Sequence, residues 1–464
     1  MFKKLLAILI SCLMLFPCGI TLAEEDFRYS LNDDGTATIT EYKGEAETLT
    51  VPENLDGHKV TVIGKNAFSA HDSLTSVSIP NSVVSIDDDA FNYCDSLISV
   101  TLPDSLTFIG ESAFNDCYSL TSIIIPDGVT SISDQAFSSC YSLTNITLPK
   151  SAASIGDHAF SGCESLTSIA IPDSVTYISD YAFYDCESLT EIVIPGSVTS
   201  LGDSAFRECY SLTSATISDG LTSIGDSAFL DCESLASVTI PDSVTYIGDY
   251  AFSGCEFLTS ITVPENVAYI GDSAFSWCES LTSVTIPNSV TSIGSNPFDS
   301  CYQLTQINIS PDHPILETID GVLFNKTTQT LVCYPCAFTE ESYVVPQGVL
   351  AIGISAFSNS DFLTSVTIPD SVICIDTLAF NRCDALTSVT IPDSVTTIGY
   401  YTFWECGSLE SLTIPESVTS IGEHAFQACS NLNLTVSPDS YAEKYAKNQG
   451  IPYTYPDSTD WLNG

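Results

Sequence analysis

The chain has 464 residues, with 58 aspartates and glutamates against only 12 lysines and arginines, and its formal net charge is −46. A surface of this charge repels the phosphates of nucleic acids and of anionic lipids, so neither is an expected ligand. Charge of one sign also keeps a long particle soluble.

The first 23 residues have the pattern of an export signal. Lys3 and Lys4 precede an apolar run over residues 5–20, and Thr21-Leu22-Ala23 supplies small residues for cleavage. The apolar run is short for a membrane span. We therefore expect a signal peptide at 1–23, a secreted or cell-surface location, and no membrane insertion once the signal is removed.

Residues 24–48 do not repeat and predict an N-terminal β cap. Phe27 and Tyr29 alternate with polar residues, Asp34-Gly35 is a hairpin turn signal, and the alternation resumes over Thr36–Tyr42.

From residue 49 onward the sequence repeats with a period of 23. Its clearest marker is a phenylalanine, at Phe68, Phe91, Phe114, Phe137, Phe160, Phe183, Phe206, Phe229, Phe252, Phe275 and Phe298, then at Phe357, Phe380, Phe403 and Phe426. A fixed period in this range is typical of a leucine-rich repeat, in which each unit buries its apolar face against its neighbours. The sequence thus predicts a β-rich repeat solenoid of 23-residue coils with parallel strands.

One coil illustrates how the repeat is built. The segment Leu281–Ile286 has the apolar spacing L-x-x-L-x-L of a repeat strand, and Pro287 ends it because proline has no amide hydrogen for a ladder. A second apolar pair follows at Val290 and Ile293. In other coils Gly-Asp, as at Gly248-Asp249, then turns the chain before an Ala-Phe pair, such as Ala251-Phe252, that fills the core.

This pattern, read over Ser234–Phe252, resembles the BspA-like class of bacterial leucine-rich-repeat proteins. The resemblance covers nearly all of the chain after the signal. It departs from repeats with an asparagine ladder, because the equivalent column is mostly serine, and this leaves the curvature of the solenoid open. That column reads Ser82, Ser105, Gly128, Ser174, Ser197, Ser243 and Asn266.

An interruption divides the repeats into a first block, residues 49–309, and a second block, residues 343–436. The spacing from Phe298 to Phe357 is 59, which is two periods plus 13 residues. Within 310–342 the sequence predicts a β-hairpin of two short strands around a polar turn at Lys326–Gln329. A similar element occurs in BspA-like proteins.

The repeat ends in a predicted C-terminal cap over residues 437–455. Alanine, glutamate and lysine over Ser440–Gln449 favour a helix, and Gly450 is placed to end it. Terminal units of a solenoid must cover the last apolar face, or the particle would polymerise end to end. We expect residues 456–464 to form a disordered tail.

Stacking turns each repeat position into a column with members about 4.8 Å apart. Thirteen cysteines form one such column, three residues before the strand leucine. We expect buried free thiols there, with a disulfide ladder as the alternative, and no metal site, because a linear stack cannot surround an ion. Cys333 and Cys336 have redox spacing but are expected to form a disulfide or to pack in the core. The column is Cys94, Cys117, Cys140, Cys163, Cys186, Cys209, Cys232, Cys255, Cys278, Cys301, Cys383, Cys406 and Cys429.

Two surface arrays are candidate binding sites. The first is the outward face of the strands, a ladder of hydroxyls suited to proteins or glycans, although threonine also simply favours strands. The second is an edge of tyrosines and carboxylates one residue after the cysteines, where loop packing is the alternative. The strand-face candidates are Ser237, Thr239, Ser260, Thr262, Ser283 and Thr285. The edge candidates are Tyr118, Tyr141, Tyr210, Tyr302, Glu233 and Glu256.

An aspartate column in the turn before each Ala-Phe pair is expected to be solvated and to cap local backbone amides, with weak calcium binding as the alternative. It comprises Asp134, Asp157, Asp180, Asp203, Asp226, Asp249 and Asp272.

The sequence predicts a binding protein and not an enzyme. The five histidines belong to no nucleophile or metal motif, and no phosphate-binding loop occurs, so no catalytic residue, cofactor or metal is assigned. The resemblance implies adhesion to host matrix proteins or to the surfaces of other microbes, and the hydroxyl face is suited to glycans as well. A structural spacer or surface scaffold is the alternative, and a hydrolase of surface polymers is a lesser one.

Overall fold

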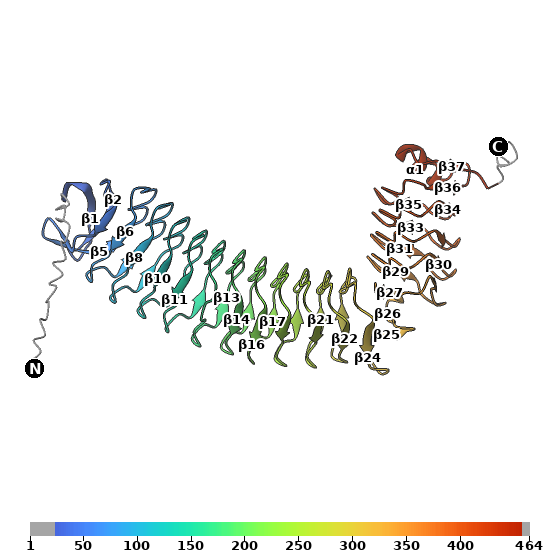
Figure 1. Ribbon diagram of the computed structural model, residues 1–464, viewed down its shortest axis with the longest axis horizontal. Helices are drawn as coiled ribbons and strands as arrows, with labels where there is room; N and C mark the ends of the chain where they lie inside the picture. Colours follow the sequence, from blue (N-terminus) through green and yellow to red (C-terminus); the bar gives the residue numbers. More distant parts are fainter. Residues whose placement is uncertain (1–23, 457–464) are drawn as a thin grey trace, which may run out of the picture.

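The computed structural model describes residues 24–456; the predicted signal peptide and all but the first residue of the predicted tail lie outside them. The chain winds into a long solenoid in which most strands pair in parallel with the strand one coil away (Figure 1). Most coils contribute a strand of three or four residues to one ladder and a two-residue strand to another. None of the described helices is long and apolar enough to span a membrane.

The longer strands form what we call the first ladder. It consists of β3 Thr48–Thr50, β6 Ser76–Ser78, β8 Ser99–Thr101, β10 Ser122–Ile124, β11 Asn145–Thr147, β14 Glu191–Ile194, β16 Ser214–Ile217, β18 Ser237–Thr239, β20 Ser260–Thr262, β22 Ser283–Ile286, β24 Gln306–Ile309, β28 Ser342–Val344, β30 Ser365–Thr367, β32 Ser388–Thr390, β34 Ser411–Ile414, β36 Asn433–Val436 and, after the helix, β37 Tyr453–Thr454.

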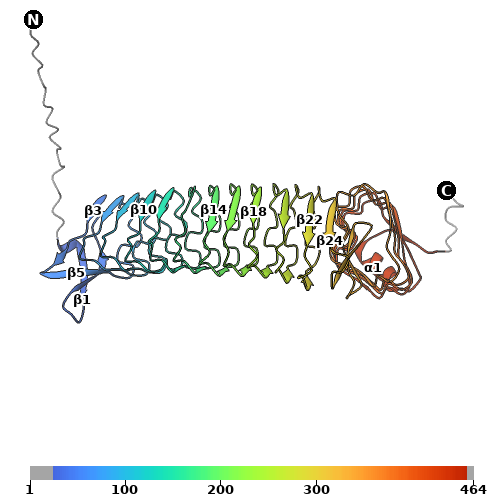
Figure 2. The same ribbon diagram turned by 90° about the horizontal axis from the view of Figure 1, so that it is seen from below.

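The second ladder lies on the opposite side of the coils and consists mostly of two-residue strands (Figure 2). It consists of β5 His58–Ile63, β7 Ser85–Ile86, β9 Phe108–Ile109, β12 Ser154–Ile155, β13 Tyr177–Ile178, β15 Ser200–Leu201, β17 Ser223–Ile224, β19 Tyr246–Ile247, β21 Tyr269–Ile270, β23 Ser292–Ile293, β27 Thr330–Cys333, β29 Ala351–Ile352, β31 Cys374–Ile375, β33 Thr397–Ile398 and β35 Ser420–Ile421.

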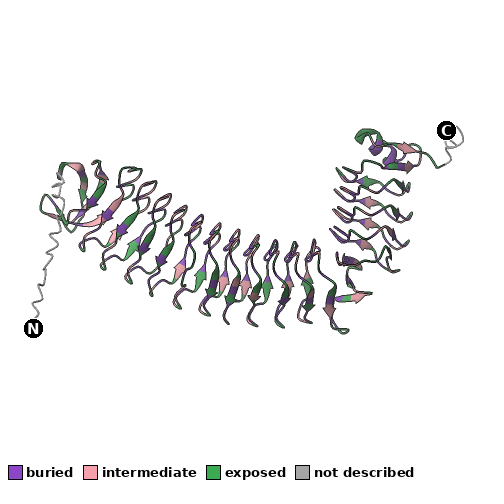
Figure 3. Cartoon of the chain, viewed as in Figure 1, coloured by how far each residue is buried: buried purple, intermediate pink, exposed green. Residues whose placement is uncertain are grey.

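The repeated phenylalanines form the spine of the core. Successive rings stack nearly parallel with centroids 4.8 to 5.8 Å apart, from Phe68 to Phe298 and again from Phe357 to Phe426. The interior of every coil is buried, while outward strand residues and turns are exposed (Figure 3). This confirms the predicted solenoid of 23-residue coils.

A tight backbone path brings each Ala-Phe pair into the core. The residues two before and two after the phenylalanine adopt left-handed backbone angles, such as Tyr250 at φ 57° and Gly254 at φ 73° around Phe252. The amide of Phe252 donates to the carbonyl of Ala274 in the next coil at 2.8 Å. Repetition of this bond along the stack satisfies buried backbone groups that would otherwise be costly.

The N-terminal end is a β cap, as predicted. Strands β1 (Phe27–Leu31) and β2 (Ala37–Tyr42) pair antiparallel, and β2 then pairs in parallel with β5 to begin the second ladder. A preceding 3-10 turn spans Glu24–Asp26. The short hairpin of β4 (Asn54–Leu55) with β5 was not predicted, because Asp56-Gly57 lies inside what looks like a first coil.

The C-terminal end is the predicted helical cap. Helix α1 spans Tyr441–Gln449; the Ser440 side chain accepts from the Glu443 amide, and Gly450 ends the helix in a left-handed conformation. The Glu443 carboxylate also accepts from Lys447 Nζ at 2.8 Å and from the Asp439 amide at 2.7 Å. These bonds, led by Lys447, lower the pKa of Glu443 to about 2.

The interruption between the blocks is one enlarged coil. Tyr334 takes the phenylalanine position: its amide donates to the carbonyl of Ala356 at 2.7 Å, and its ring lies 5.2 Å from that of Phe357. The extra residues form antiparallel strands β25 (Leu316–Ile319) and β26 (Val322–Asn325), which lead into β27. The predicted hairpin around Lys326–Gln329 is confirmed as the pair β26 and β27, whereas β25 was missed.

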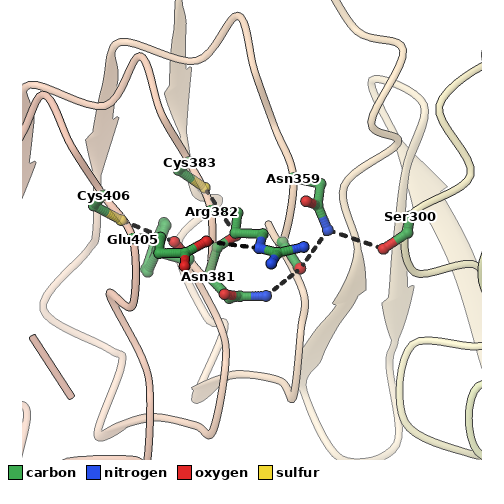
Figure 4. Close-up of polar contacts among 9 residues, drawn as sticks. Ser300, Asn359, Asn381, Arg382, Cys383, Glu405 and Cys406 are labelled. Carbon is green, nitrogen blue, oxygen red and sulfur yellow. Dashed lines mark hydrogen bonds and ion pairs between the residues drawn. The ribbon is translucent and has the colours of Figure 1, made fainter. Parts of the chain in front are cut away.

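The solenoid changes direction at this coil. The first block follows a gentle arc, and the second block leaves it at a steep angle, so that Figure 2 views the second block nearly along its axis. Two buried amides join the blocks: Asn296 Nδ2 donates to the carbonyl of Ser355 at 2.7 Å, and Asn359 Nδ2 donates to Ser300 Oγ at 2.9 Å (Figure 4). The curvature that the sequence left open is thus set partly by this junction.

Candidate binding surfaces

The predicted strand-face residues lie together on the outer side of the first ladder. Ser237, Thr239, Ser260, Thr262 and Thr285 are exposed, and Ser283 is half-buried. Equivalent residues pair in register, Ser260 with Ser283 and Thr262 with Thr285, so the side chains form straight rows. The intervening Ile261 and Val284 point inward and are buried, as strand alternation requires.

Most of these hydroxyls are available for a ligand. Among the described residues, the Ser237, Thr239, Ser260, Thr262 and Ser283 hydroxyls form no hydrogen bond; Thr285 Oγ1 accepts a long one, 3.4 Å, from Asn308. Two other threonine columns behave differently, because each hydroxyl donates to a carbonyl of the preceding coil. Examples from these columns are Thr213 to Thr190, Thr282 to Thr259, Thr222 to Thr199 and Thr245 to Thr222.

The first ladder also has a gap that sequence reasoning missed. The sheet ends at β11 and restarts at β14, and the intervening Ser168–Ile171 segment joins no sheet. A cleft of about 430 Å³ opens there, lined partly by Ala170, Glu191 and Val193. Alanine and valine stand where neighbouring coils have threonine, so a break in the hydroxyl row was the available signal.

The tyrosines of the predicted edge have different neighbours. Tyr118 and Tyr141 stack with ring centroids 5.0 Å apart, and Tyr210 lies near the carboxylates of Glu208 and Glu233. Burial and then these neighbouring carboxylates raise the pKa of Tyr210 to about 12.

The remaining edge candidates differ in accessibility and place. Glu233 is exposed, Glu256 and Tyr302 are half-buried, and Tyr302 packs edge-on against Trp277 with centroids 6.1 Å apart. Tyr302 lies in the last coil of the first block, distant along the stack from Tyr118. The tyrosines of the edge therefore lie at separate places along the stack, with glutamates between them.

Carboxylates crowd the middle of this edge. Burial and then Glu187, Glu164 and Glu208 raise the pKa of Asp185 to about 6. Arg207 offsets part of this charge through an ion pair with Glu208 at 2.8 Å. In the second block Arg382 forms an ion pair with Glu405 of the next coil at 2.9 Å (Figure 4).

The cysteine column is structural, and the prediction of buried free thiols is confirmed. The described cysteines form no disulfide, and the column members are buried except Cys429, which is half-buried. Each of the thirteen thiols donates to the carbonyl of a core aromatic residue in the preceding coil, at 2.9 to 3.4 Å; Cys278 Sγ donates to Phe252, for example. Burial raises the pKa of Cys163 to about 12. Cys333 and Cys336 are likewise free and buried.

The aspartate column links neighbouring coils, whereas we expected local caps. In seven places along the first block a side-chain oxygen at this position accepts the amide of the equivalent residue one coil later, at 2.6 to 3.1 Å, as Asp226 does for Asp249. The serine column donates instead: Ser105 and Ser174 bond carbonyls of the preceding coil at 2.7 and 2.6 Å. Within residues 24–456, no group of three or more histidines, cysteines or carboxylates is arranged to hold a metal ion.

Comparison with known proteins agrees with this architecture. The family model described as BspA type leucine rich repeat region matches residues 61–152, 130–257, 222–342 and 332–446. A leucine-rich repeat protein from Bacteroides ovatus is 27% identical, with a TM-score of 0.56 over 93% of this chain and 98% of the other. A leucine rich cell surface protein from Faecalibacterium prausnitzii is 30% identical over 94% and 95% of the two chains, with a TM-score of 0.46. No relative is found among the curated proteins.

These matches span most of the chain, so it belongs to the BspA-type leucine-rich-repeat family. Membership of this family is consistent with a repeat surface that binds proteins.

Proposed function

We propose that the chain is a secreted or cell-surface adhesin that binds host matrix proteins or microbial surface proteins, or the glycans they carry, through the strand face of the first ladder. The observation that carries the proposal is the row of exposed hydroxyls at Ser237, Thr239, Ser260 and Thr262 that have no partner within the described chain. Hydroxyls that both donate and accept suit peptide and sugar groups alike.

The export pattern of residues 1–23 supports an extracellular location, and the Faecalibacterium relative is described as a cell surface protein. The high negative charge disfavours nucleic acid and anionic membranes as ligands. The strand face of the first ladder offers a broad row of uncharged hydroxyls on a rigid stack, and this arrangement suits extended macromolecular ligands.

The test is binding to arrays of matrix proteins and glycans, compared between two triple variants. Thr239→Lys, Thr262→Lys and Thr285→Lys place bulk and charge on the strand face. Thr222→Lys, Thr245→Lys and Ala268→Lys add the same charge beside the second ladder, also at exposed positions. We expect the first variant to lose at least tenfold in affinity and the second to retain binding.

Three other results would contradict the proposal. Absence of any saturable ligand would favour a spacer or scaffold. Loss of binding in the second variant instead of the first would move the site to the other ladder. Release of sugars or peptides from the array would indicate a hydrolase.

A further inference from the structure

The outer face of the second ladder carries an aromatic pair in the first block. The rings of Tyr246 on β19 and Tyr269 on β21 stack with centroids 4.9 Å apart and an interplanar angle of 9°. Tyr246 is 37% exposed, and Tyr250 in the following turn is 47% exposed. Part of this aromatic pair is therefore open to solvent on a paired sheet.

Carboxylates surround these rings. Tyr246 Oη donates to Asp226 Oδ1 at 3.4 Å, and Tyr269 Oη donates to Asp249 Oδ1 at 3.2 Å. The same oxygens accept the amides of Asp249 and Asp272 at 2.9 and 2.8 Å, which fixes the carboxylates in place. Burial and then Asp249 raise the pKa of Tyr269 to about 12, as a strongly negative environment requires.

This negative charge has no counterpart within the described chain. Among the described residues, no lysine, arginine or histidine forms an ion pair with Asp226, Asp249 or Asp272, and their second carboxylate oxygens accept no hydrogen bond. A complementary charge must come from outside the described chain.

The fold does not require these side chains. The same strand position is Ser200, Ser223 and Ser292 in other coils of the first block, with the same parallel pairing. In the second block the aspartate position is Thr377 or Tyr400, and the coils still stack. Tyr246 and Tyr269 thus add a surface property beyond what the stack needs.

We propose that this face, defined by Tyr246, Tyr269, Asp226 and Asp249, binds a basic segment of a protein partner through its arginine or lysine side chains. A guanidinium or ammonium group over a tyrosine face is attracted by the ring, and Arg also pairs with carboxylates in a planar fork. The occupant follows from charge complementarity on an exposed sheet face, and it is separate from the strand-face ligand proposed above.

The probe is a fluorescein-labelled heptapeptide, Gly-Arg-Gly-Arg-Gly-Arg-Gly, titrated by anisotropy at physiological salt with the full chain. A second peptide with citrulline at the three arginines has the same shape without charge. The key variant is Tyr246→Ser with Tyr269→Ser, since serine occupies this position in neighbouring coils and every carboxylate remains. We expect about a tenfold loss of affinity in this variant, because two cation–π contacts with arginine are removed.

The control for general charge attraction is Asp242→Asn with Glu265→Gln, which removes two exposed carboxylates from turns after the first ladder. Asp226→Asn with Asp249→Asn removes the same charge beside the tyrosines and should weaken binding at least fivefold, whereas the control should stay within twofold. Equal binding by the tyrosine variant and the native chain, or equal binding of the citrulline peptide, would overturn the proposal. Circular dichroism of each variant verifies that the solenoid is intact.

Discussion

Phe229 in the first block and Phe380 in the second are both fully buried, and each stacks on the phenylalanine of the next coil at 5.3 and 5.2 Å. Their surroundings differ outside the core. In the first block aspartate oxygens accept amides of the next coil, whereas the second block has Thr377 and Tyr400 at that position. The comparison teaches that the aromatic and thiol columns define the coil, and that the aspartate ladder is an addition confined to one block.

The largest effect should come from the shared core. Phe229→Ala and Phe380→Ala should each lower the free energy of unfolding by about 3–5 kcal/mol, because each leaves a cavity in a close-packed stack. Urea denaturation followed by fluorescence in single-tryptophan variants that keep either Trp277 or Trp404 reports the two blocks separately, because the chain has three tryptophans.

The matched controls are Phe257→Ala and Phe362→Ala, whose rings are 60% and 52% exposed in the first and second block. These should change stability by less than about 0.5 kcal/mol. If the two core variants differed from each other by more than about 2 kcal/mol, the cores would not be equivalent.

The next effect concerns the junction between the blocks. Burial raises the pKa of Asp299 to about 6, against opposing hydrogen bonds led by Ser358 and Ser300. A raised carboxyl pKa means that the folded state prefers the protonated form, so this group costs stability as pH rises from about 4 through 6.

Asp299→Asn should therefore stabilise the chain by about 1–2 kcal/mol at pH 7.5 and by almost nothing at pH 4. Thermal or urea unfolding of the two proteins across this pH range measures the difference. Asp242→Asn, at an exposed turn, is the control for a simple change of net charge. A gain independent of pH would show that ionisation of Asp299 is not its cause.

A smaller gain in stability is expected from one substitution in the cysteine column. Ser360 stands where the column has cysteine; its hydroxyl is buried without a hydrogen bond, and the matching carbonyl belongs to Tyr334. Ser360→Cys should restore the thiol bond and add about 1 kcal/mol of stability. Ser360→Ala only removes the unpaired hydroxyl and should therefore stabilise the chain by less than Ser360→Cys. Equal stability of the cysteine variant and the native chain in urea would argue against a bonding role for the column.

Much of this architecture was predictable because one period dominates the sequence. The phenylalanine column, the strand prolines, the hairpin around Lys326–Gln329 and the helix between Ser440 and Gly450 all follow from local chemistry. Free thiols were also predictable, since a column packed against copies of itself needs only small apolar groups.

Other features depend on contacts between coils that no single coil reveals. The bonds from Cys278 to Phe252 and from the Asp249 amide to Asp226 join residues 26 and 23 positions apart, so they require the stacking geometry. Predicting the bend requires knowing that Tyr334 takes a place in the aromatic stack. The count of 13 extra residues does not show this. Sequence pattern likewise identified the strand-face residues but not which hydroxyls other contacts already use.

The smallest effect tests the aspartate ladder itself. Asp226→Ala removes the acceptor of the Asp249 amide and should cost about 1 kcal/mol, whereas Asp226→Asn keeps a side-chain oxygen and should cost less. Thr377→Ala at the same position of the second block should change stability by under about 0.5 kcal/mol, because the Thr377 hydroxyl forms no hydrogen bond among the described residues. Equal losses in the two alanine variants, measured by urea unfolding, would mean that the amide bonds contribute nothing specific. The second block would then stack as firmly as the first, and the aspartates would act through their charge alone.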